Sequence, residues 1–202
     1  MKSTIKGSLQ VFFGSLISAV GIQMFLFANL GVDPISTLLL GILNHTNLRF
    51  GTASQLFNVI ILILVFLLDR KKIGIGSVIN GLSVGFFINL LSQFKIDHYF
   101  IGNAFLYGVL GPIILGIGTG IYLQANLGCG ALEGLMMIFS EKFNISVKYI
   151  RMFLDLLLVV SGILLGSIYG IGTLLGVILI GPSIEYSLKF INQLSSKKKK
   201  RE

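Results

Sequence analysis

Charged side chains are scarce in this sequence. Of its 202 residues only 12% are Asp, Glu, Lys or Arg, whereas 54% are hydrophobic and the mean hydropathy is +0.90. A soluble domain carries roughly 25% charged residues, because its surface faces water. The missing charge therefore predicts an all-α integral membrane protein, a polytopic helix bundle whose surface mostly faces lipid. A chain of this length made of long helices leaves no room for a separate soluble domain.

The sequence also lacks the patterns on which most enzyme and metal sites depend. Its single cysteine, Cys129, excludes an internal disulfide, and its two histidines, His45 and His98, fall in predicted outer loops far apart in the chain. There is no His-Glu-x-x-His motif, no pair of cysteines and no nucleophile elbow. We therefore expect no catalytic residues, no cofactor and no metal site.

The net charge of +8 does not indicate nucleic-acid binding, because the basic residues stand between and after the apolar runs. Residues 197–201 read KKKKR directly after the last apolar segment, and such a block typically stays in the cytoplasm near anionic lipid headgroups. A solvated tail without a partner explains the same block. We expect one transmembrane domain over residues 1–196, a basic cytoplasmic tail over 197–202, the lipid bilayer as a partner and no nucleic acid.

Six apolar segments approach the roughly 20 residues that a helix needs to cross a bilayer. They lie at about 9–29, 52–68, 74–92, 104–126, 148–168 and 172–191. Two further apolar segments, 34–44 and 131–143, are too short to cross comfortably, so we expect re-entrant or interfacial helices there. The first long segment exceeds the apolar part of a signal peptide and lacks a cleavage site, so we interpret it as an uncleaved span.

The positions of the basic residues decide how these segments cross. With six spans and a cytoplasmic N-terminus, fourteen of the sixteen Lys and Arg residues lie inside, and only Arg49 and Lys95 lie outside. If the two short segments also crossed, Arg70, Lys71 and Lys72 would move outside, against the positive-inside rule. The expected location is therefore the bacterial cell membrane, with several spans and with both termini cytoplasmic.

The two halves of the chain resemble each other. Ala-Asn-Leu-Gly occurs at 28–31 and at 125–128, and the same shift of 97 residues superimposes several glycines. A one-residue deletion then aligns Gly-Ile-Gly at 74–76 with Gly-Ile-Gly at 170–172. Each half holds three predicted spans, an odd number, so the second half would be inverted in the membrane. This is the 3+3 inverted repeat of many secondary transporters. The two repeats cover about 8–92 and about 104–191.

Longer sequences carry a resemblance to a known group. The first half contains ANLGVDPIST and IGIGSVINGLSVGFFINLL, and the second contains ANLGCGALEGLM and YGIGTLLGVILIGPSIEY. With these sequences the chain resembles the YitT/YczE group of bacterial membrane proteins, the YczE branch most closely, over nearly its whole length. The resemblance implies a membrane protein of uncharacterised function with suspected transport activity. It implies no catalytic residues.

Acidic residues stand at the starts of both short segments. Asp33 suits the cap position of a helix whose first residue is Pro34, and Glu133 lies in the first turn of the second helix, where an acid complements the helix dipole. If both helix N-termini point toward a central site, they would bind an anionic or polar solute. Capping alone is the simpler explanation for Asp33. A helix lying flat at the cytoplasmic interface is the simpler one for the amphipathic segment around Glu133.

Two acidic residues fall inside predicted spans. Asp155 lies about two turns into the fifth span, where it either lines a pathway or pairs with Arg151 four residues earlier. Glu185 in the last span either takes part in proton coupling or pairs with Lys189 near the membrane surface. We favour the ion pair in both cases. Asn58 suits a hydrogen bond between helices as well as a ligand contact.

The preferred hypothesis is a small-solute transporter or permease of unknown substrate. Its candidate solute-binding or pathway residues are Asn29, Asp33, Asn58, Asn126, Glu133, Asp155 and Glu185. All of these except Asn58 and Glu185 are predicted to approach a common polar cavity. The alternatives are a membrane-bound accessory or regulatory protein without transport activity, and a solute-binding subunit of a vitamin uptake complex. A homo-oligomer or a membrane partner is compatible with each hypothesis.

Overall fold

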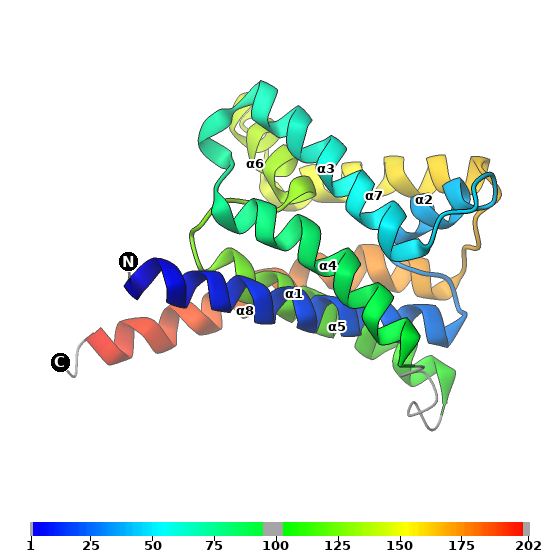
Figure 1. The fold of residues 1–202 in the computed structure, drawn as a ribbon, viewed down its shortest axis with the longest axis horizontal. Coiled ribbons are helices and arrows are strands. Elements are labelled where there is room, and N and C mark those ends of the chain that lie inside the picture. Colours follow the sequence, from blue (N-terminus) through cyan, green and yellow to red (C-terminus); the bar gives the residue numbers. More distant parts are fainter. Residues whose placement is uncertain (1, 95–102, 200–202) are drawn as a thin grey trace.

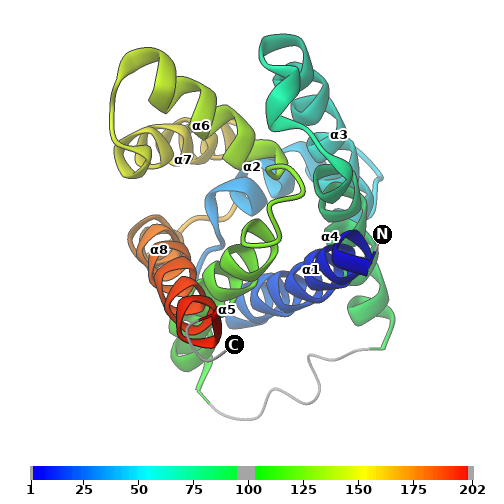
Figure 2. The same ribbon diagram turned by 90° about the vertical axis from the view of Figure 1, so that its left-hand side faces the viewer.

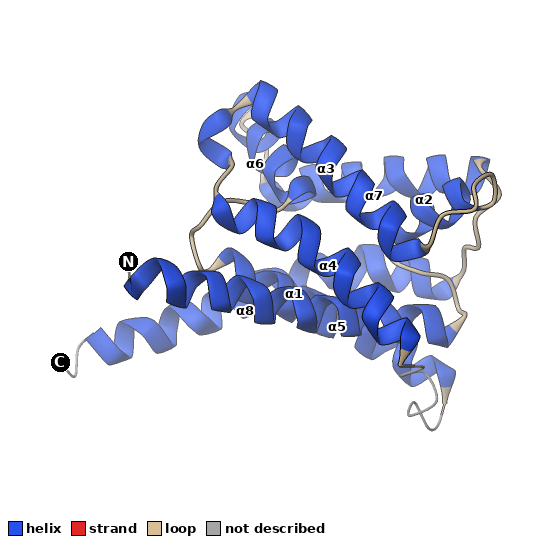
Figure 3. Ribbon diagram, viewed as in Figure 1, coloured by secondary structure: helices blue, strands red, loops and turns tan. Residues whose placement is uncertain are grey.

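The computed structural model describes residues 2–94 and 103–199, and every regular element within them is a helix (Figure 1, Figure 3). The first half contains α1 (Lys2–Ala28), α2 (Pro34–Leu43), α3 (Phe50–Leu68), the 3-10 helix η1 (Arg70–Lys72) and α4 (Ile75–Gln93). The second half contains α5 (Ala104–Leu123), α6 (Ala131–Phe143), α7 (Val147–Leu164) and α8 (Ile171–Lys199). The predicted all-α class is confirmed, and each half has its short helix second in order.

Five of these helices, α1, α3, α4, α5 and α8, are long and apolar enough to cross a membrane. Large hydrophobic side chains cover much of their outer surface, and Ile60, Leu67, Phe86 and Phe105 are all exposed. Water disfavours a continuous apolar surface of this kind, whereas lipid does not. The chain is therefore a multi-pass membrane protein.

The long helices run roughly along one direction and alternate in sense, so that α1 begins and α8 ends at the same end of the molecule (Figure 1). In the end-on view, α4, α1, α5 and α8 follow one another, α3 and the α6–α7 pair lie above them, and α2 sits inside (Figure 2). Helix α2 contacts α3 of its own half and α7 and α8 of the other half. The interior is thus enclosed by both halves.

Helices α1 and α5 cross with their backbones almost in contact. A Cβ atom at Gly21 would lie 2.5 Å from the backbone nitrogen of Leu115 and 2.8 Å from the carbonyl oxygen of Gly111. A Cβ atom at Gly14 would lie 2.8 Å from the carbonyl oxygen of Gly118. Only glycine fits such approaches, which are typical of membrane helices. The shift of 97 residues superimposes Gly14 on Gly111 and Gly21 on Gly118, so the equivalent glycines contact one another crosswise.

Both Ala-Asn-Leu-Gly sequences form the same turn. Asn29 and Asn126 have φ angles of 50° and 51°, in the left-handed region that asparagine tolerates better than most residues. Asn29 directly follows α1 and Asn126 lies three residues after the last residue of α5, and the glycines two positions further on, Gly31 and Gly128, have φ angles of 97° and 110°. The repeated sequence therefore encodes a helix end followed by a sharp reversal of the chain.

Each of these turns is held by the other half of the chain. The N–H of Gly172 donates to the carbonyl oxygen of Leu30 at 2.7 Å, and the N–H of Gly76 donates to the carbonyl oxygen of Leu127 at 2.8 Å. Gly76 and Gly172 belong to the two aligned Gly-Ile-Gly sequences at the starts of α4 and α8. The two halves therefore exchange equivalent hydrogen bonds.

Helix α6 is also tied to the turn between α3 and α4. The N–H of Cys129 donates to the carbonyl oxygen of Lys72 at 3.0 Å, and the Lys72 ammonium donates to the carboxylate of Glu141. The hydrogen bond from Lys72 to Glu141 raises the pKa of Lys72 above its usual value. The ion pair therefore favours the charged form of Lys72 and ties α6 to the η1 turn.

The end of α7 differs from the predicted span at 148–168. The helix stops at Leu164, because Gly166 has a φ of 79° and the N–H of Ser167 donates back to the carbonyl oxygen of Gly162 at 2.9 Å. This is the Schellman arrangement that ends many helices. Local backbone geometry, rather than hydropathy, sets this boundary.

Other helices extend past their predicted spans. Helix α1 begins at Lys2 and α8 continues to Lys199, because helical hydrogen bonding does not require apolar side chains. The basic tail predicted over 197–202 thus prolongs α8, and its last three residues lie beyond the described part of the chain. Lys95 and His98, both predicted in an outer loop, fall in the undescribed segment 95–102.

Candidate solute-binding pocket

A small cavity lined by both polar and apolar side chains lies between the α1–α5 pair and the starts of α2 and α6. Its volume is about 70 Å³, and about 10–15 Å³ on this measure suffices for one water molecule. Charged lining residues are Asp33, Glu133 and Arg151. Uncharged polar lining residues include Ser18, Ser54, Asn58, Asn80, Thr119 and Tyr122. Polar and ionisable groups are expensive at membrane depth, so their convergence here marks a candidate functional site.

Asp33 places its carboxylate at the N-terminus of α2. Its Oδ2 accepts the N–H of Ser36 at 3.1 Å, and Pro34 is the first helical residue, as the sequence predicts. Asp33 is only 3% exposed, and its Oδ1 has no hydrogen-bond partner among the described residues. Buried polar atoms are nearly always paired, so an unpaired carboxylate oxygen is an unusual feature of this pocket.

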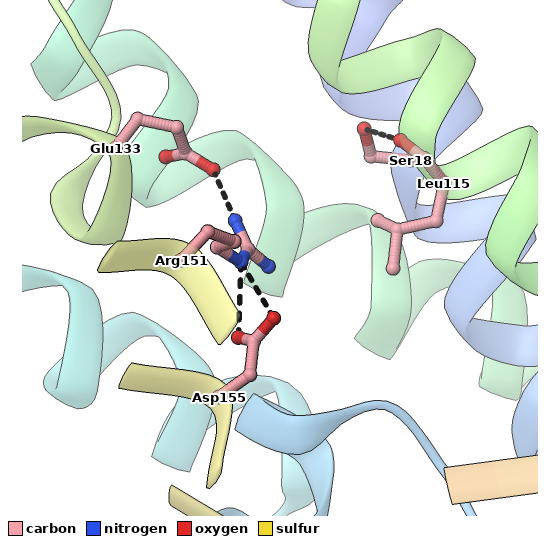
Figure 4. Close-up of polar contacts among 5 residues, drawn as sticks. All are labelled: Ser18, Leu115, Glu133, Arg151 and Asp155. Atoms are coloured by element: carbon pink, nitrogen blue, oxygen red, sulfur yellow. Dashed lines mark hydrogen bonds and ion pairs between the residues drawn. The ribbon is translucent and has the colours of Figure 1, made fainter. Parts of the chain in front are cut away.

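Arg151 on α7 joins carboxylates from two helices (Figure 4). Its Nε lies 2.9 Å from both oxygens of Asp155, one turn further along α7, and its Nη1 lies 3.4 Å from Oε1 of Glu133 in the first turn of α6. Arg151 and Asp155 are buried, with 6% and 1% exposure. The predicted pair is therefore confirmed, and it extends to α6. The guanidinium of Arg151 faces Ser18 and Leu115 of the α1–α5 pair across the pocket (Figure 4).

Two asparagines line the pocket from α3 and α4. The amide of Asn58 donates to the carbonyl oxygen of Ser54 at 2.9 Å, and the amide of Asn80 donates to the hydroxyl of Ser15 at 2.9 Å. The second bond joins α4 to α1, a role typical of polar side chains at this depth. Under the 97-residue shift, Ser54 and Asn58 correspond to the two residues of the buried ion pair in α7. The first half therefore carries uncharged residues at the two positions that hold the ion pair in the second half.

Several candidate residues from the sequence meet at this pocket. Asp33, Asn58 and Glu133 line the cavity directly. Asp155 stands behind Arg151 and reaches the pocket through it. The pocket thus contains residues from both short helices and from α7.

The remaining candidates lie elsewhere. Asn29 and Asn126 are exposed at the ends of α1 and α5, where their left-handed backbone serves the turn and their side chains stay outside the pocket. Glu185 is exposed on α8 and forms an ion pair with Lys189, as the spacing of four residues predicts. The structure therefore does not bring these three residues to the pocket.

Sequence reasoning did not single out some pocket residues. Arg151 is predicted only as a partner of Asp155, although an arginine inside an apolar segment normally faces the protein interior, which is a usable signal. Tyr122 and Thr119 of α5 are also buried at the pocket, and nothing in their pattern separates them from the rest of that helix. Gly130, at the position that corresponds to Asp33, leaves room for the Tyr122 hydroxyl and the Glu133 carboxylate.

Comparison with known proteins places this fold in a family. A family model described as "Family of unknown function (DUF6198)" matches residues 5–189, which include every residue that lines the pocket. The chain belongs to DUF6198. No solved structure matches it.

Relatives of this DUF6198 chain occur in distant bacteria. An uncharacterized protein of Haemophilus influenzae is 27% identical over 182 residues, covering 90% of this chain and 83% of the relative. The uncharacterized membrane protein YczE of Bacillus subtilis is 28% identical, covering 88% and 83%, and the uncharacterized protein YyaS of the same organism is 29% identical, covering 83% and 85%. The resemblance to YczE seen in the sequence is confirmed.

Proposed function

We propose that this DUF6198 protein is a six-span transporter or permease for a small polar solute, which binds in the pocket beside Arg151. One observation carries the proposal. Two short helices, α2 from the first half and α6 from the second, begin at the same buried polar pocket. Many secondary transporters bind their solutes near the middle of the membrane between interrupted helices of this kind. A protein that only scaffolds a partner has no need to bury charged groups around a cavity.

An inverted 3+3 repeat accounts for the contacts between the halves. The glycine contacts between α1 and α5 occur as two equivalent contacts, in which the two halves exchange roles. The hydrogen bonds of the two Ala-Asn-Leu-Gly turns form an equivalent pair in the same way. Two units related by an axis in the membrane plane produce this pattern, and they require α1 and α5 to run antiparallel, as they do in Figure 1. These contacts support the proposed repeat.

Helix α7 is the sixth span in this proposal, although it contains Lys148, Arg151 and Asp155 and is not among the five strongly apolar helices. Its 18 residues extend about 27 Å, close to the roughly 30 Å of a bilayer core. Arg151 and Asp155 are buried together, whereas Phe153 and Leu157 are exposed on the outer face. Lipid would therefore contact an apolar surface, and the charges would face the pocket.

The proposed orientation puts both termini and the η1 turn in the cytoplasm, because that arrangement places fourteen of the sixteen Lys and Arg residues inside a bacterial cell membrane. Helix α6, which is tied to the η1 turn, then enters from the cytoplasmic side. Helix α2 enters from the outer side. Each short helix and its turn would close one of the two entrances to the pocket.

A thermal-shift screen of the purified full-length protein against a metabolite library tests this function, because a solute that binds only the folded form raises Tm. The matched variants are Glu133→Gln in the pocket and Glu141→Gln on the exposed side of the same helix. We expect a hit to raise the Tm of the wild type and E141Q, to raise that of E133Q much less, and to enter proteoliposomes that contain the wild type.

Two outcomes would contradict the transporter proposal. The first is a broad library without any hit, which would favour the accessory or regulatory hypothesis. The second is a hit that shifts E133Q as much as the wild type, which would place the binding site elsewhere.

A further inference from the structure

The two oxygens of the Asp33 carboxylate have different surroundings. Oδ2 accepts the N–H of Ser36 and caps α2. Oδ1 is buried at the pocket and has no hydrogen-bond partner within residues 2–94 and 103–199. A buried carboxylate oxygen without a hydrogen-bond donor is disfavoured as an anion, so it favours binding of a proton or a cation.

The charged groups around Asp33 do not supply such a partner. From α7, Arg151 faces the pocket with its Nε bonded to Asp155 and its Nη1 to Glu133 of α6, and Oδ1 of Asp33 accepts none of its N–H groups. Helix α5 contributes the phenol of Tyr122, and the lining residues from α1, α3, α4 and α8 are uncharged. The N-terminus of α2 adds only a partial positive charge. In and directly behind the pocket, the described residues therefore include three carboxylates, Asp33, Glu133 and Asp155, and one guanidinium.

We propose that the pocket binds a small monovalent cation, H⁺ or Na⁺, at the Asp33 carboxylate. H⁺ settles on Oδ1, whereas Na⁺ also uses neutral oxygens of the lining, such as the hydroxyls of Ser54 and Thr119. Because cation and solute share one pocket, each changes the affinity for the other, which is the basis of coupled transport. The coupling role rests on the proposed transport function, but the cation binding does not.

The substitution Asp33→Asn isolates this role. Asparagine caps helices about as well as aspartate, so its side-chain oxygen keeps the bond from Ser36 while the charge and the proton site are lost. Asp69→Asn is the matched control, because Asp69 caps η1 by accepting the N–H of Lys71 at 3.0 Å, outside the pocket. If D33N does not fold, Asp33→Ser, which also places a good cap at this position, replaces it.

Two measurements on the full-length protein in nanodiscs distinguish the proton from sodium. For the proton, infrared absorption of protonated carboxylic acids is recorded from about pH 9 down to about pH 6, above the range in which ordinary Asp and Glu side chains titrate. For sodium, Tm is followed while sodium chloride replaces choline chloride at constant ionic strength. Each tenfold rise in sodium above its Kd is expected to raise Tm by about 3–6 °C.

The proposal is supported if the wild type and D69N give one of these signals and D33N loses it. It is overturned if the wild type gives neither signal, or if D33N gives the same signal as the wild type. Both measurements are made at equilibrium without solute. A cation signal in a protein that moves no solute would reject the transport function and keep the cation site. Solute uptake unchanged in D33N would keep the transport function and reject the coupling role of Asp33.

Discussion

Removing the anionic partner of Arg151 is expected to destabilise the protein strongly. The Nε atom of Arg151 and the carboxylate oxygens of Asp155 are 2.9 Å apart and buried, and at an effective dielectric constant of about 20 their gross attraction is about 6 kcal/mol. Desolvation offsets much of it. Asp155→Leu, however, leaves a buried guanidinium with only the contact to Glu133, and such a loss costs about 3–5 kcal/mol. For a chain of this size, Tm would fall by about 6–20 °C.

Thermal unfolding of the purified protein in detergent, followed by far-ultraviolet circular dichroism, measures this change. Glu185→Leu is the matched control, because Glu185 and Lys189 form a pair at the same spacing of four residues, with side chains that are 60% and 68% exposed. Exposed pairs contribute little to stability, so the control is expected to shift Tm by less than about 2 °C.

Substituting both partners tests the reasoning further. Arg151→Met leaves both Asp155 and Glu133 without their cation, so it is expected to be less stable than D155L. The double variant R151M/D155L removes both buried charges of α7 and is expected to be more stable than R151M, because only Glu133 then lacks its cation. The argument from burial would be refuted if D155L lowered Tm no more than the Glu185→Leu control, or if the double variant were no more stable than R151M.

Further substitutions test the packing, the turns and the orientation. Gly21→Ala presses a methyl group against the α5 backbone and is expected to lower Tm by several degrees. Gly181→Ala, with nothing within 4 Å of its added Cβ, is expected to leave Tm unchanged or slightly higher. Equal effects of the two substitutions would argue against the close crossing of α1 and α5. Asn29→Val forces a β-branched residue to a φ of 50° and is expected to cost about 1–2 kcal/mol in chemical denaturation, whereas Asn29→Gly should cost little. In a cysteine-free background, Lys71→Cys in the cytoplasmic η1 turn should react with an impermeant maleimide only in inside-out vesicles. Leu48→Cys, on the outer side, should react only in intact cells. Labelling of each cysteine from the opposite side would contradict the proposed orientation.

Hydropathy predicts the positions of most helices because apolar composition is itself the requirement for contact with lipid. The predicted spans 52–68 and 74–92 correspond to α3 and α4 within two residues at each end. Helix ends are less predictable, because they depend on single residues such as Gly166, whose positive φ stops α7 inside an apolar run. An apolar run therefore locates a helix in this chain but does not define its last turn.

The pocket is only partly predictable, because membership depends on contacts between segments distant in the sequence. Asp33 and Glu133 are predicted from their places at helix starts, and both line the cavity. Asn29 and Asn126 belong to the repeated motif, but the motif specifies a backbone turn and leaves their side chains outside. The role of Arg151 depends on where α6 docks against α7, which no local pattern encodes.

The pocket combines a repeated scaffold with an unrepeated distribution of charge. The crosswise contacts treat the halves alike, yet Asp33 corresponds to Gly130, and the Arg151–Asp155 pair corresponds to the neutral pair Ser54–Asn58. Equivalent turns on both sides suit a site that opens alternately to each face. Unequal charge separates an orphan carboxylate at the start of α2 from a guanidinium held by α6 and α7. In the proposed coupled transporter, a cation and a polar solute would then occupy different parts of one cavity, which two identical half-sites would not allow.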